Sequence, residues 1–598
     1  MQPLPEERRT VYHLLKSASE VWGTAPALLQ PKGNGEYRTY TWLDYREIAE
    51  ELAAGLFSLG LVKGDIVGLA SETRAEFYLA DLGVMTAGCI AAAVYTSLSP
   101  AEQAKTILAC EPKAVFVENP KTMAALQSAG AAAIHTHWIL LEGDAEGAVT
   151  FAALRELGQK HLVENSGIVD YFCNRVCPQD HAILYLTSGA TGEPKMGLVT
   201  HHAITTNCEM GPKVLPVGPE DWTLAFLPSA HITQRLVMEL LMIRHGVPVW
   251  FSEGLAKLPK ELLSVRPTFF VAPPRLWERI YSSISTEIRK KPAPLRKLIY
   301  LGIGVGSNVL RARRAGKSPD PFAAASLKFF ERVVFRKIIA RLGGRLRIAV
   351  SGAAPLGKDL AEFYASIGLP LVEGYGLTEG GVVILNPFDH PVAGSIGVPL
   401  PGVEVKLGED NELLIRSPSL FSGYYKDPAA TAAVLRDGWL HTGDIAEIDK
   451  KGFISITGRK KELIVSSNGK KIFPARIEAL FKLEPLVNQV FLIGDRLPYM
   501  TAIVTLNQTA AEQVRGATAA SLAELAESPA IQSEMRKVVT RVNKQLAPFE
   551  QIRKFKIIER EFSLEAGELT PTMKLRRAKV LENFKQQISE FYAGREDA

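Results

Sequence analysis

A loop of hydroxyl and glycine residues that ends in a lysine is the most informative chemical feature of the sequence. Residues 184–200 read Leu-Tyr-Leu-Thr-Ser-Gly-Ala-Thr-Gly-Glu-Pro-Lys-Met-Gly-Leu-Val-Thr, and an apolar run at 182–186 leads into the loop. Small residues let backbone N–H groups approach phosphate oxygens closely, while hydroxyls and Lys195 add donors and charge. The loop is not a Walker motif, because Lys195 follows Gly192 by three residues and no Ser or Thr follows the lysine. Alone, it indicates either a phosphate site or a turn.

Further polar motifs follow the loop at wide spacing. They are Gly-Tyr-Gly-Leu-Thr-Glu at 374–379, Trp-Leu-His-Thr-Gly-Asp at 439–444, Gly-Arg-Lys-Lys-Glu at 458–462 and Leu-Thr-Pro-Thr-Met-Lys-Leu-Arg-Arg at 569–577. In this order the motifs resemble the AMP-forming acyl-adenylating superfamily of acyl-CoA synthetases, peptide-synthetase adenylation domains and luciferases. The resemblance extends from about residue 40 to about residue 580. Stretches at 227–231, 266–278 and 567–572 are similar to the long-chain fatty acid–CoA ligase branch.

The resemblance implies a reaction in which a carboxylate attacks the α-phosphate of ATP and expels pyrophosphate. Both reactants are anions, so the site needs positive charge and Mg²⁺. By resemblance, the loop embraces the β- and γ-phosphates through Thr187, Ser188, Gly189, Ala190, Thr191, Gly192 and Lys195. The sequence departs from the family pattern twice, with Ala190 in place of the usual threonine and Met196 in place of the usual glycine. We expect these changes to weaken the loop contacts at most, because the backbone cradle remains.

The resemblance also implies the other nucleotide contacts. Thr187 and Glu379, counted here with the catalytic residues, match Mg²⁺-associated positions, and Thr378 matches a phosphate contact. Asp444 is expected to accept from both ribose hydroxyls, with Arg459 as its partner. The adenine ring is expected to stack on Tyr375 against an opposite wall of small residues. That wall is Gly352, Ala353 and Ala354, and Gly374 and Gly376 beside Tyr375 are also expected to bind the nucleotide.

Two further catalytic residues come from the same resemblance. Lys574 is similar to the lysine that bridges the carboxylate and the α-phosphate during adenylation. Because it lies in a basic C-terminal segment, the alternative is that Lys574 is a solvated surface charge. His231 is similar to the residue beside the acyl carboxylate. We expect His231 to position the substrate rather than move a proton, because the carboxylate already attacks as an anion. A structural histidine in the core is the alternative.

The second half-reaction, attack of a thiolate on the acyl-adenylate, needs access for coenzyme A. Family members are thought to provide it by rotating the C-terminal domain about a hinge, and Lys461 matches the hinge position. Gly469 and Lys470 match the segment that lines the thiol tunnel in the rotated pose. An ordinary polar turn is the alternative for that segment.

Alternating helical and strand patterns must position these motifs. Helices are predicted at 44–59 and 74–87. Strands are predicted at 66–70, 114–117, 224–227, 247–251, 268–271 and 346–350. Such alternation indicates crossover units and a largely parallel sheet. Ligands of open α/β sheets bind beyond the carboxyl ends of strands, so we expect loops at 187–195, 351–355 and 374–379 on one rim.

The predicted fold class is α/β, in two hinged parts. A chain of 598 residues exceeds one ordinary core. We predict a large N-terminal domain over 1–458, with stacked α/β sheets that bind AMP and the acyl group. Short strands with turns predict a β subdomain over about 395–458. A small, mobile α+β domain is predicted over 459–598.

Composition indicates a globular protein of a reducing compartment. The sequence is 47% hydrophobic and 22% charged, and its 5 cysteines are scattered. Residues 1–9 do not form a signal peptide, and no run approaches the roughly 18 apolar residues that a spanning helix needs. We therefore expect a cytoplasmic protein, which could also bind peripherally to the inner face of a membrane.

Positive charge is concentrated in one region. Residues 289–347 hold 16 Lys and Arg and 2 acidic residues, a net +14, so the rest of the chain carries −9 against a total of +5. Within it, residues 327–342 alternate apolar and basic side chains at helical spacing. This pattern is typical either of an amphipathic helix at an anionic membrane or of a core-packed helix with a solvated basic face. Nucleic acid is not expected as a partner, because no binding module accompanies the charge.

The acyl substrate is predicted from apolar stretches near the loop, at 236–242, 247–251 and 269–272, which hold no acidic partner for an ammonium group. We predict a long-chain fatty acid–CoA ligase that uses ATP, Mg²⁺ and coenzyme A, and the sequence gives no prediction of the oligomeric state. The alternatives are an aryl or medium-chain acyl-CoA ligase, a fatty acyl-AMP ligase that serves a carrier protein, and a non-catalytic lipid-binding protein. Fatty acyl-AMP ligases carry an insertion near the hinge, and the short segment 458–469 shows none, which disfavours that enzyme. The presence of the catalytic positions Lys574 and Glu379 disfavours a non-catalytic protein.

Overall fold

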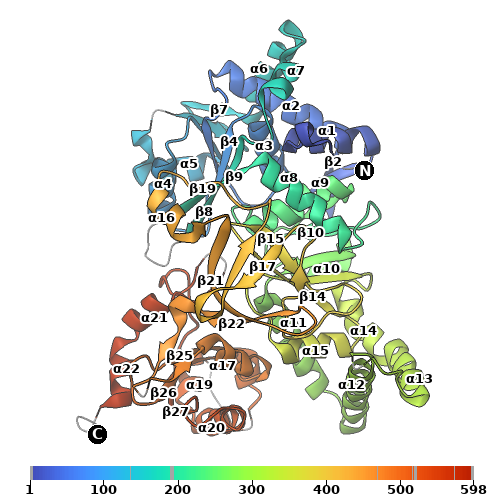
Figure 1. Cartoon of the computed structure of the whole chain (residues 1–598), viewed down its shortest axis with the longest axis vertical. Helices are drawn as coiled ribbons and strands as arrows, with labels where there is room; N and C mark the ends of the chain where they lie inside the picture. The colour runs from blue at the N-terminus through green and yellow to red at the C-terminus, as the bar shows by residue number, and fades with distance from the viewer. Residues whose placement is uncertain are drawn as a thin grey trace.

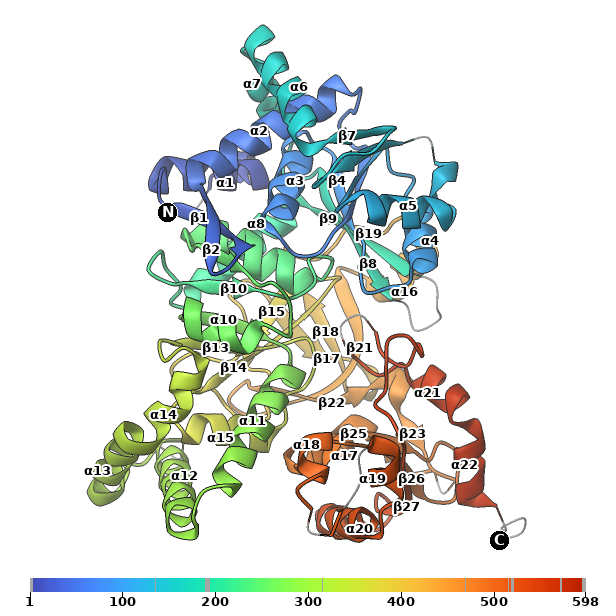
Figure 2. The same ribbon diagram turned by 180° about the vertical axis from the view of Figure 1, so that it is seen from behind.

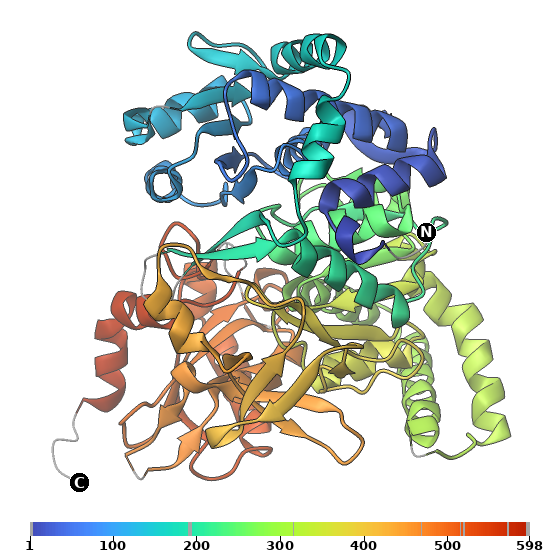
Figure 3. The same cartoon turned by 45° about the horizontal axis from the view of Figure 1, so that its top comes forward.

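The computed structural model describes residues 4–134, 136–188, 194–314, 316–467, 469–514, 516–517, 521–570 and 573–593. The molecule is elongated. Helices α1 (Val11–Trp22) and α2 (Trp42–Ser58) lie toward one end, and the C-terminal part, drawn in red, lies toward the other (Figures 1, 2 and 3).

A largely parallel sheet carries the glycine-rich segment. Its strands follow the order β19-β9-β8-β4-β3-β5-β6-β7. They are β3 (Ile66–Ala70), β4 (Ile90–Ala93), β5 (Ala114–Val117), β6 (His137–Leu140), β7 (Ala148–Thr150), β8 (His181–Ser188), β9 (Pro194–Thr200) and β19 (Gly423–Tyr424). Strands β8, β9 and β19 pair antiparallel, so the glycine-rich residues connect two paired strands. Helix α3 (Ala75–Thr86) is buried along its length because it contacts both the sheet and α2. The helices and strands predicted at this end of the chain are thus confirmed.

A second sheet, of order β12-β13-β14-β15-β16, lies in the middle of the molecule. It comprises β12 (Phe269–Ala272), β13 (Ile348–Ser351), β14 (Leu371–Leu377), β15 (Gly381–Leu385) and β16 (Val398–Pro399). The expectation of a loop at 374–379 was wrong in part, because residues up to Leu377 continue β14 and pair antiparallel with β15. Gly376 makes this pairing possible, since a Cβ there would lie 2.5 Å from the Gly381 carbonyl oxygen.

Two smaller sheets flank this centre. One has the order β10-β11-β1-β2 and comprises β1 (Pro26–Gly33), β2 (Glu36–Thr41), β10 (Thr223–Ala225) and β11 (Val249–Phe251). The other comprises β17 (Glu404–Leu407), β18 (Glu412–Arg416), β20 (Leu435–Arg436), β21 (Trp439–Ile448) and β22 (Ile454–Arg459). In the second sheet Asp444 of β21 lies directly opposite Arg459 of β22. The sheet register therefore brings together two motifs that are separate in the sequence.

The C-terminal part has its own hydrophobic core. Strands β25 (Val487–Ile493), β26 (Met500–Leu506) and β27 (Ile552–Ile557) form a mixed sheet, preceded by the β23 (Ile464–Val465) and β24 (Lys471–Ile472) pair. Helices α17 (Pro474–Leu480), α19 (Leu522–Glu527) and α20 (Pro529–Asn543) contribute to the core. Helices α21 (Arg577–Asn583) and α22 (Lys585–Tyr592) cover a second, smaller cluster.

The basic region forms a projecting group of helices. Helix α11 (Pro274–Arg289) leads into α12 (Ala293–Arg314) and α13 (Pro321–Phe330), which lie side by side (Figures 1 and 2). The segment predicted as one amphipathic helix at 327–342 continues α13 through a π-helical turn, Glu331–Phe335, into α14 (Arg336–Ile339). Within the described ranges, every helix is too short or too polar to cross a bilayer.

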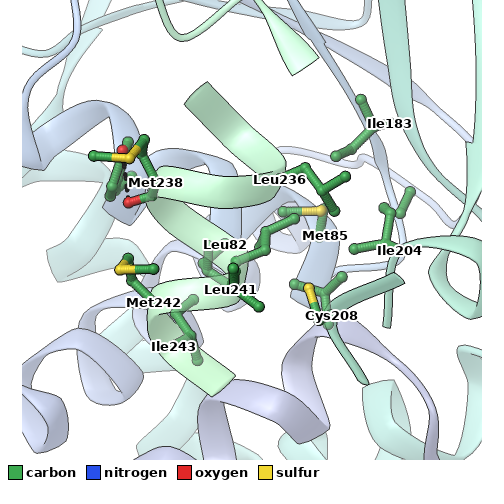
Figure 4. Packing of buried hydrophobic residues seen from close by; sticks show 14 of the residues in the cluster. Leu82, Met85, Ile183, Ile204, Cys208, Leu236, Met238, Leu241, Met242 and Ile243 are labelled. Atoms are coloured by element: carbon green, nitrogen blue, oxygen red, sulfur yellow. Dashed lines mark hydrogen bonds between the residues drawn. The ribbon is translucent and has the colours of Figure 1, made fainter. Parts of the chain in front are cut away.

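The largest hydrophobic core lies where the π-helix Thr233–Leu240 and α9 (Leu241–His245) meet α3 and α8 (His201–Met210). Figure 4 shows Leu236 and Leu241 next to Met85 and Cys208 in this core. The π-helix packs one face into the core, and its other side chains border the cavity that contains the candidate site.

Candidate functional site

Most of the predicted site residues line one cavity of about 970 Å³. Its walls come from the sheet that contains β12–β16, the sheet that contains β18, β21 and β22, the π-helix Thr233–Leu240 and the C-terminal part of the chain. The predicted residues that line it are Lys195, His231, Gly352, Ala353, Gly374, Tyr375, Gly376, Thr378, Glu379, Arg459, Lys461 and Lys574. The expected common rim is therefore confirmed for Lys195, for Gly352 and Ala353, and for residues 374–379, which all line this cavity.

The phosphate end of the cavity is only partly within the described residues. Positions 189–193, which include Gly189, Ala190, Thr191 and Gly192, lie outside them, as do the side chains of Thr187 and Ser188. Lys195 is described, and its Nζ lies 4.7 Å from the ring centroid of Tyr424. Tyr424 in turn donates a hydrogen bond from its hydroxyl to Glu379 Oε1, at 2.5 Å. A cation, an aromatic ring and a carboxylate thus lie in sequence along one wall.

Tyr424 is a site residue that the sequence analysis missed. It belongs to none of the motifs, and a tyrosine between Gly423 and Tyr425 carries no chemical signal of its own. It reaches the cavity because β19 pairs with β9 at the edge of the parallel sheet. Burial, followed by the nearby Glu379 carboxylate, raises the pKa of Tyr424, so the hydroxyl stays protonated and remains a donor to Glu379.

A buried carboxylate marks the predicted ribose position. Asp444 is 3% exposed and is hydrogen bonded through both oxygens: Arg459 Nε lies 2.8 Å from Oδ1, and the Tyr375 hydroxyl lies 2.5 Å from Oδ2. The Thr442 side chain accepts the backbone N–H of Asp444 at 3.1 Å. The negative charge of Asp444 raises the pKa of the Arg459 guanidinium, which stays charged. The structure thus brings together the predicted residues Tyr375, Asp444 and Arg459.

The small residues expected to face adenine lie where β13 ends. A Cβ on Gly352 would lie 3.4 Å from the Gly374 carbonyl oxygen, so the ends of β13 and β14 approach closely. Ala353 adopts a left-handed backbone with φ of 71°, which turns the chain away from the strand. Gly352 and Ala353 border the cavity, whereas Ala354 is not among the residues that line it.

Lys574 enters the cavity from the C-terminal part on a tight turn. The Thr570 N–H donates to the Lys574 carbonyl at 2.8 Å, and the Lys574 N–H donates to Thr570 Oγ1 at 3.1 Å. Met573 supports the turn with a φ of 63°. The side chain remains in contact with solvent in the open cavity but is surrounded by protein. This burial, followed by the positive charge of Arg459, lowers the pKa of Lys574 to about 8.

His231 faces the same cavity on the N-terminal side. The ring atom Nδ1 accepts the backbone N–H of Thr233 at 3.2 Å, and the backbone N–H of His231 donates to the Pro228 carbonyl at 2.9 Å. Burial and, secondly, the charge of Lys574 lower the pKa of His231 to about 3. The ring is therefore neutral at physiological pH, with Nε2 as its remaining donor. This arrangement suits the orientation of a carboxylate better than proton transfer.

The far end of the cavity is apolar. It is lined by side chains of the π-helix, α8, α9, β12 and connecting segments, namely Tyr95, Cys208, Leu215, Leu236, Val237, Leu241, Phe269, Val271 and Leu400. Most belong to segments that the sequence analysis marked only as apolar stretches, because hydrophobic residues at helical spacing do not show whether they face a core or a cavity.

Two predicted residues lie apart from the cavity. Gly469 and Lys470 sit on the turn between β23 and β24, where the Gly469 N–H donates to the Ser466 carbonyl at 2.8 Å. Lys461, the predicted hinge, lies in the short 3₁₀ turn Lys460–Glu462 that follows β22 at the cavity rim.

The residues present are compatible with a magnesium ion held mainly by substrate. Within the described ranges, no group of three or more His, Cys, Asp or Glu could bind a metal by itself. Mg²⁺ usually retains waters and binds through one or two carboxylates together with substrate phosphates. Glu379, at the phosphate end of the cavity and with one oxygen bonded to Tyr424, provides such a single carboxylate.

Comparison with known proteins gives the family. The model of the AMP-binding enzyme family matches residues 15–425, and that of the AMP-binding enzyme C-terminal domain matches residues 461–596. Long-chain-fatty-acid–CoA ligase FadD15 of Mycobacterium bovis is 34% identical over 552 residues, which cover 90% of both chains. Human long-chain-fatty-acid–CoA ligase 1 is 31% identical over 635 residues, covering 98% of this chain and 86% of its own.

Solved structures agree at the level of the fold. The anthranilate CoA ligase AuaEII in complex with anthranoyl-AMP matches with a TM-score of 0.73 at 19% identity, covering 98% of this chain and 99% of its own. The adenylation domain of a carboxylate reductase from Mycobacterium chelonae matches with a TM-score of 0.75 at 22% identity, and the match covers 98% of this chain and 91% of that domain's chain. The matched family models, the relatives that cover nearly the whole chain and the shared fold lead to one conclusion: the chain belongs to the AMP-binding enzyme family.

Proposed function

We propose that this protein is a long-chain fatty acid–CoA ligase that activates its acid as an acyl-adenylate before transfer to coenzyme A. One observation carries the proposal: Lys574, His231 and Glu379 face a single cavity that has charged groups at one end and an apolar lining at the other. The relatives named long-chain-fatty-acid–CoA ligases support the choice of acid and thiol.

In the first half-reaction the fatty carboxylate attacks the α-phosphorus and pyrophosphate leaves. Lys574 carries the positive charge that offsets repulsion between the two anions and stabilises the charge that develops at the α-phosphate. His231 donates from Nε2 to hold the carboxylate in line. Asp444 fixes the ribose, and Tyr375 stacks on adenine against Gly352 and Ala353.

The phosphate end completes the site. Lys195 and the glycine-rich residues, including Thr187 and Ser188, hold the β- and γ-phosphates, assisted by Thr378. Glu379 and Thr187 would hold Mg²⁺, which when bound offsets the charge of the leaving pyrophosphate. Tyr424 orients Glu379 through its 2.5 Å hydrogen bond.

The second half-reaction uses a different arrangement of the two parts. We place the N-terminal domain at 1–458 and the mobile domain at 459–598, with the hinge at Lys461. In the present arrangement Lys574 occupies the cavity, as adenylation requires. Rotation about Lys461 would withdraw Lys574 and bring Gly469 and Lys470 to the pantetheine path.

Separate assays of the half-reactions test this assignment. Lys574→Ala should lower the rate of adenylation by about 10²–10³-fold, measured as palmitate-dependent exchange of pyrophosphate into ATP, and should spare thioester formation from supplied palmitoyl-adenylate. Loss of both half-reactions in a folded variant would contradict the role given to Lys574. Pyrophosphate release without any thioester in the unaltered protein would favour a fatty acyl-AMP ligase instead.

Region 289–347 is proposed as a peripheral membrane contact. Helix α13 and the turn after it bury Phe330, Val334 and Phe335 but leave Phe322 81% and Phe329 54% exposed. These two phenylalanines are seven residues apart and share a face, beside the exposed cations Lys328 and Arg332. A core-packed helix accounts for the buried side alone, whereas exposed rings flanked by cations suit an anionic lipid surface.

Co-sedimentation with vesicles tests the contact. The protein should bind phosphatidylglycerol vesicles more than phosphatidylcholine vesicles, and Phe322→Ser with Phe329→Ser should weaken binding without loss of ligase activity. Val163→Ser, which alters a side chain 84% exposed on α6 (Phe151–Glu164), is the matched control. Equal binding by all variants would refute the proposed face.

A further inference from the structure

Helix α11 presents one face to the C-terminal part of the chain. Arg275, Glu278 and Ser282 are spaced by three and four residues and so share a side of the helix. Ser282 Oγ accepts a hydrogen bond from Asn507 Nδ2 at 3.0 Å. In the amide orientation that satisfies both groups, the side-chain oxygen of Gln489 accepts from the Arg275 guanidinium. Glu278, between them, pairs with Lys482, so all three positions on this face contact residues beyond position 480.

The middle contact is an ion pair at the end of α17. Lys482, in the 3₁₀ turn Phe481–Leu483, lies with Nζ 2.9 Å from Glu278 Oε1, and both side chains are largely shielded, at 24% and 16% exposure. Its neighbour Leu483 packs against the hydrophobic cluster that contains Trp277. Charge and apolar contacts thus coincide at one point between the two parts.

Lys482 also contacts the wall of the nucleotide site. Its ammonium donates a second hydrogen bond, of 2.7 Å, to the carbonyl of Pro355, two residues beyond Ala353. The next N–H, of Leu356, donates to Glu373 Oε1 at 3.0 Å, and Glu373 directly precedes Gly374. The turn that follows β13 is therefore held from the C-terminal part by Lys482 and from strand β14 by Glu373.

We infer that Lys482, paired with Glu278 and bonded to Pro355, is a positioning residue for adenylation: it holds the C-terminal part in the pose that places Lys574 in the cavity and braces the wall beside Ala353. The inference rests on the proposed function, since it assigns the contact to one of the two half-reactions. Rotation about Lys461 must break the Lys482 contacts, so they stabilise the first pose and not the second.

The two half-reactions distinguish this role. Lys482→Ala should lower the rate of palmitate-dependent pyrophosphate exchange by about three- to tenfold, because a largely shielded ion pair and a hydrogen bond no longer favour the pose. It should leave the KM for palmitate and thioester formation from supplied palmitoyl-adenylate unchanged. Lys482→Glu should be worse, since it faces Glu278, and adding Glu278→Lys should restore part of the rate.

A control and a second readout make the outcome decisive. Lys537→Ala removes an ion pair with Glu534 that lies within α20 alone, and should change neither half-reaction. The backbone amides of residues 481–483 and 275–282 should exchange hydrogen faster in Lys482→Ala but not in Lys537→Ala, and this difference should not depend on which substrate is bound. Unchanged exchange protection, or equal losses in both half-reactions, would overturn the inference. Absence of palmitate-dependent pyrophosphate exchange in the unaltered protein would instead contradict the proposed function.

Discussion

Lys574 should make adenylation fall as the pH rises through 8. The proposed mechanism needs the ammonium form, and its pKa is lowered from 10.5 to about 8. A group with this pKa is about 90% protonated at pH 7 and about 10% protonated at pH 9. Because kcat/KM reports the ionisation of the free enzyme, kcat/KM for the first half-reaction should fall roughly tenfold over this range.

Arginine at the same position isolates the effect. A guanidinium stays charged beyond pH 12, so Lys574→Arg should show no corresponding fall, even if its geometry makes it slower overall. Other groups titrate equally in both proteins. One is Glu373, whose buried carboxyl has its pKa raised to about 7. The pKa of His231 is about 3, so its ring does not change charge over this range.

The assay is palmitate-dependent pyrophosphate exchange between pH 6.5 and 9.5, without coenzyme A so that no thiol titrates. Lys574→Ala should lower the rate by about 10²–10³-fold at pH 7, the usual effect of removing one preorganised donor from a developing charge. A flat profile in the unaltered protein, or the same fall in Lys574→Arg, would refute the assignment of the ammonium as the active form.

Substitutions at the ribose contact, in helix α12 and at the apolar end of the cavity should have separable effects. Asp444→Ala should raise the KM for ATP by about 10- to 100-fold, because charge-assisted hydrogen bonds contribute about 1.5–3 kcal/mol; an unchanged KM would exclude the ribose role. Gly306→Ala should lower the melting temperature, since its Cβ would lie 2.1 Å from the Ser366 carbonyl oxygen, an overlap that costs about 1–3 kcal/mol. Gly304→Ala, with nothing within 4 Å, should not lower it, and equal melting shifts would contradict this reasoning. Val237→Phe should favour octanoate over palmitate in kcat/KM, and an unaltered preference would show that Val237 does not border the acyl chain.

Local patterns predicted most of the sheet framework. Strands at 66–70 and 114–117 were placed at their observed bounds, because short apolar runs between turn residues have few other solutions. The motif at 374–379 was harder to predict. It was expected as a rim loop beyond the end of a strand, but Gly376 instead permits the close pairing of β14 and β15, a tertiary contact that composition does not reveal.

The residues of the candidate site were also predicted only in part from the sequence. Asp444 and Arg459 were paired from their motifs, and the sheet register between β21 and β22 supplies the physical reason. Tyr424 and Lys482 could not be found from the sequence, because each acts through a contact between distant segments: an added edge strand in one case, and an ion pair to α11 in the other.

The most direct test of the central claim measures pyrophosphate and palmitoyl thioester together, with ATP, Mg²⁺ and palmitate, in the presence and absence of coenzyme A. A long-chain fatty acid–CoA ligase should turn over only with coenzyme A and should release one pyrophosphate for each thioester formed. Release of pyrophosphate without thioester, or no product from palmitate or any acid of a chain-length series, would contradict the account.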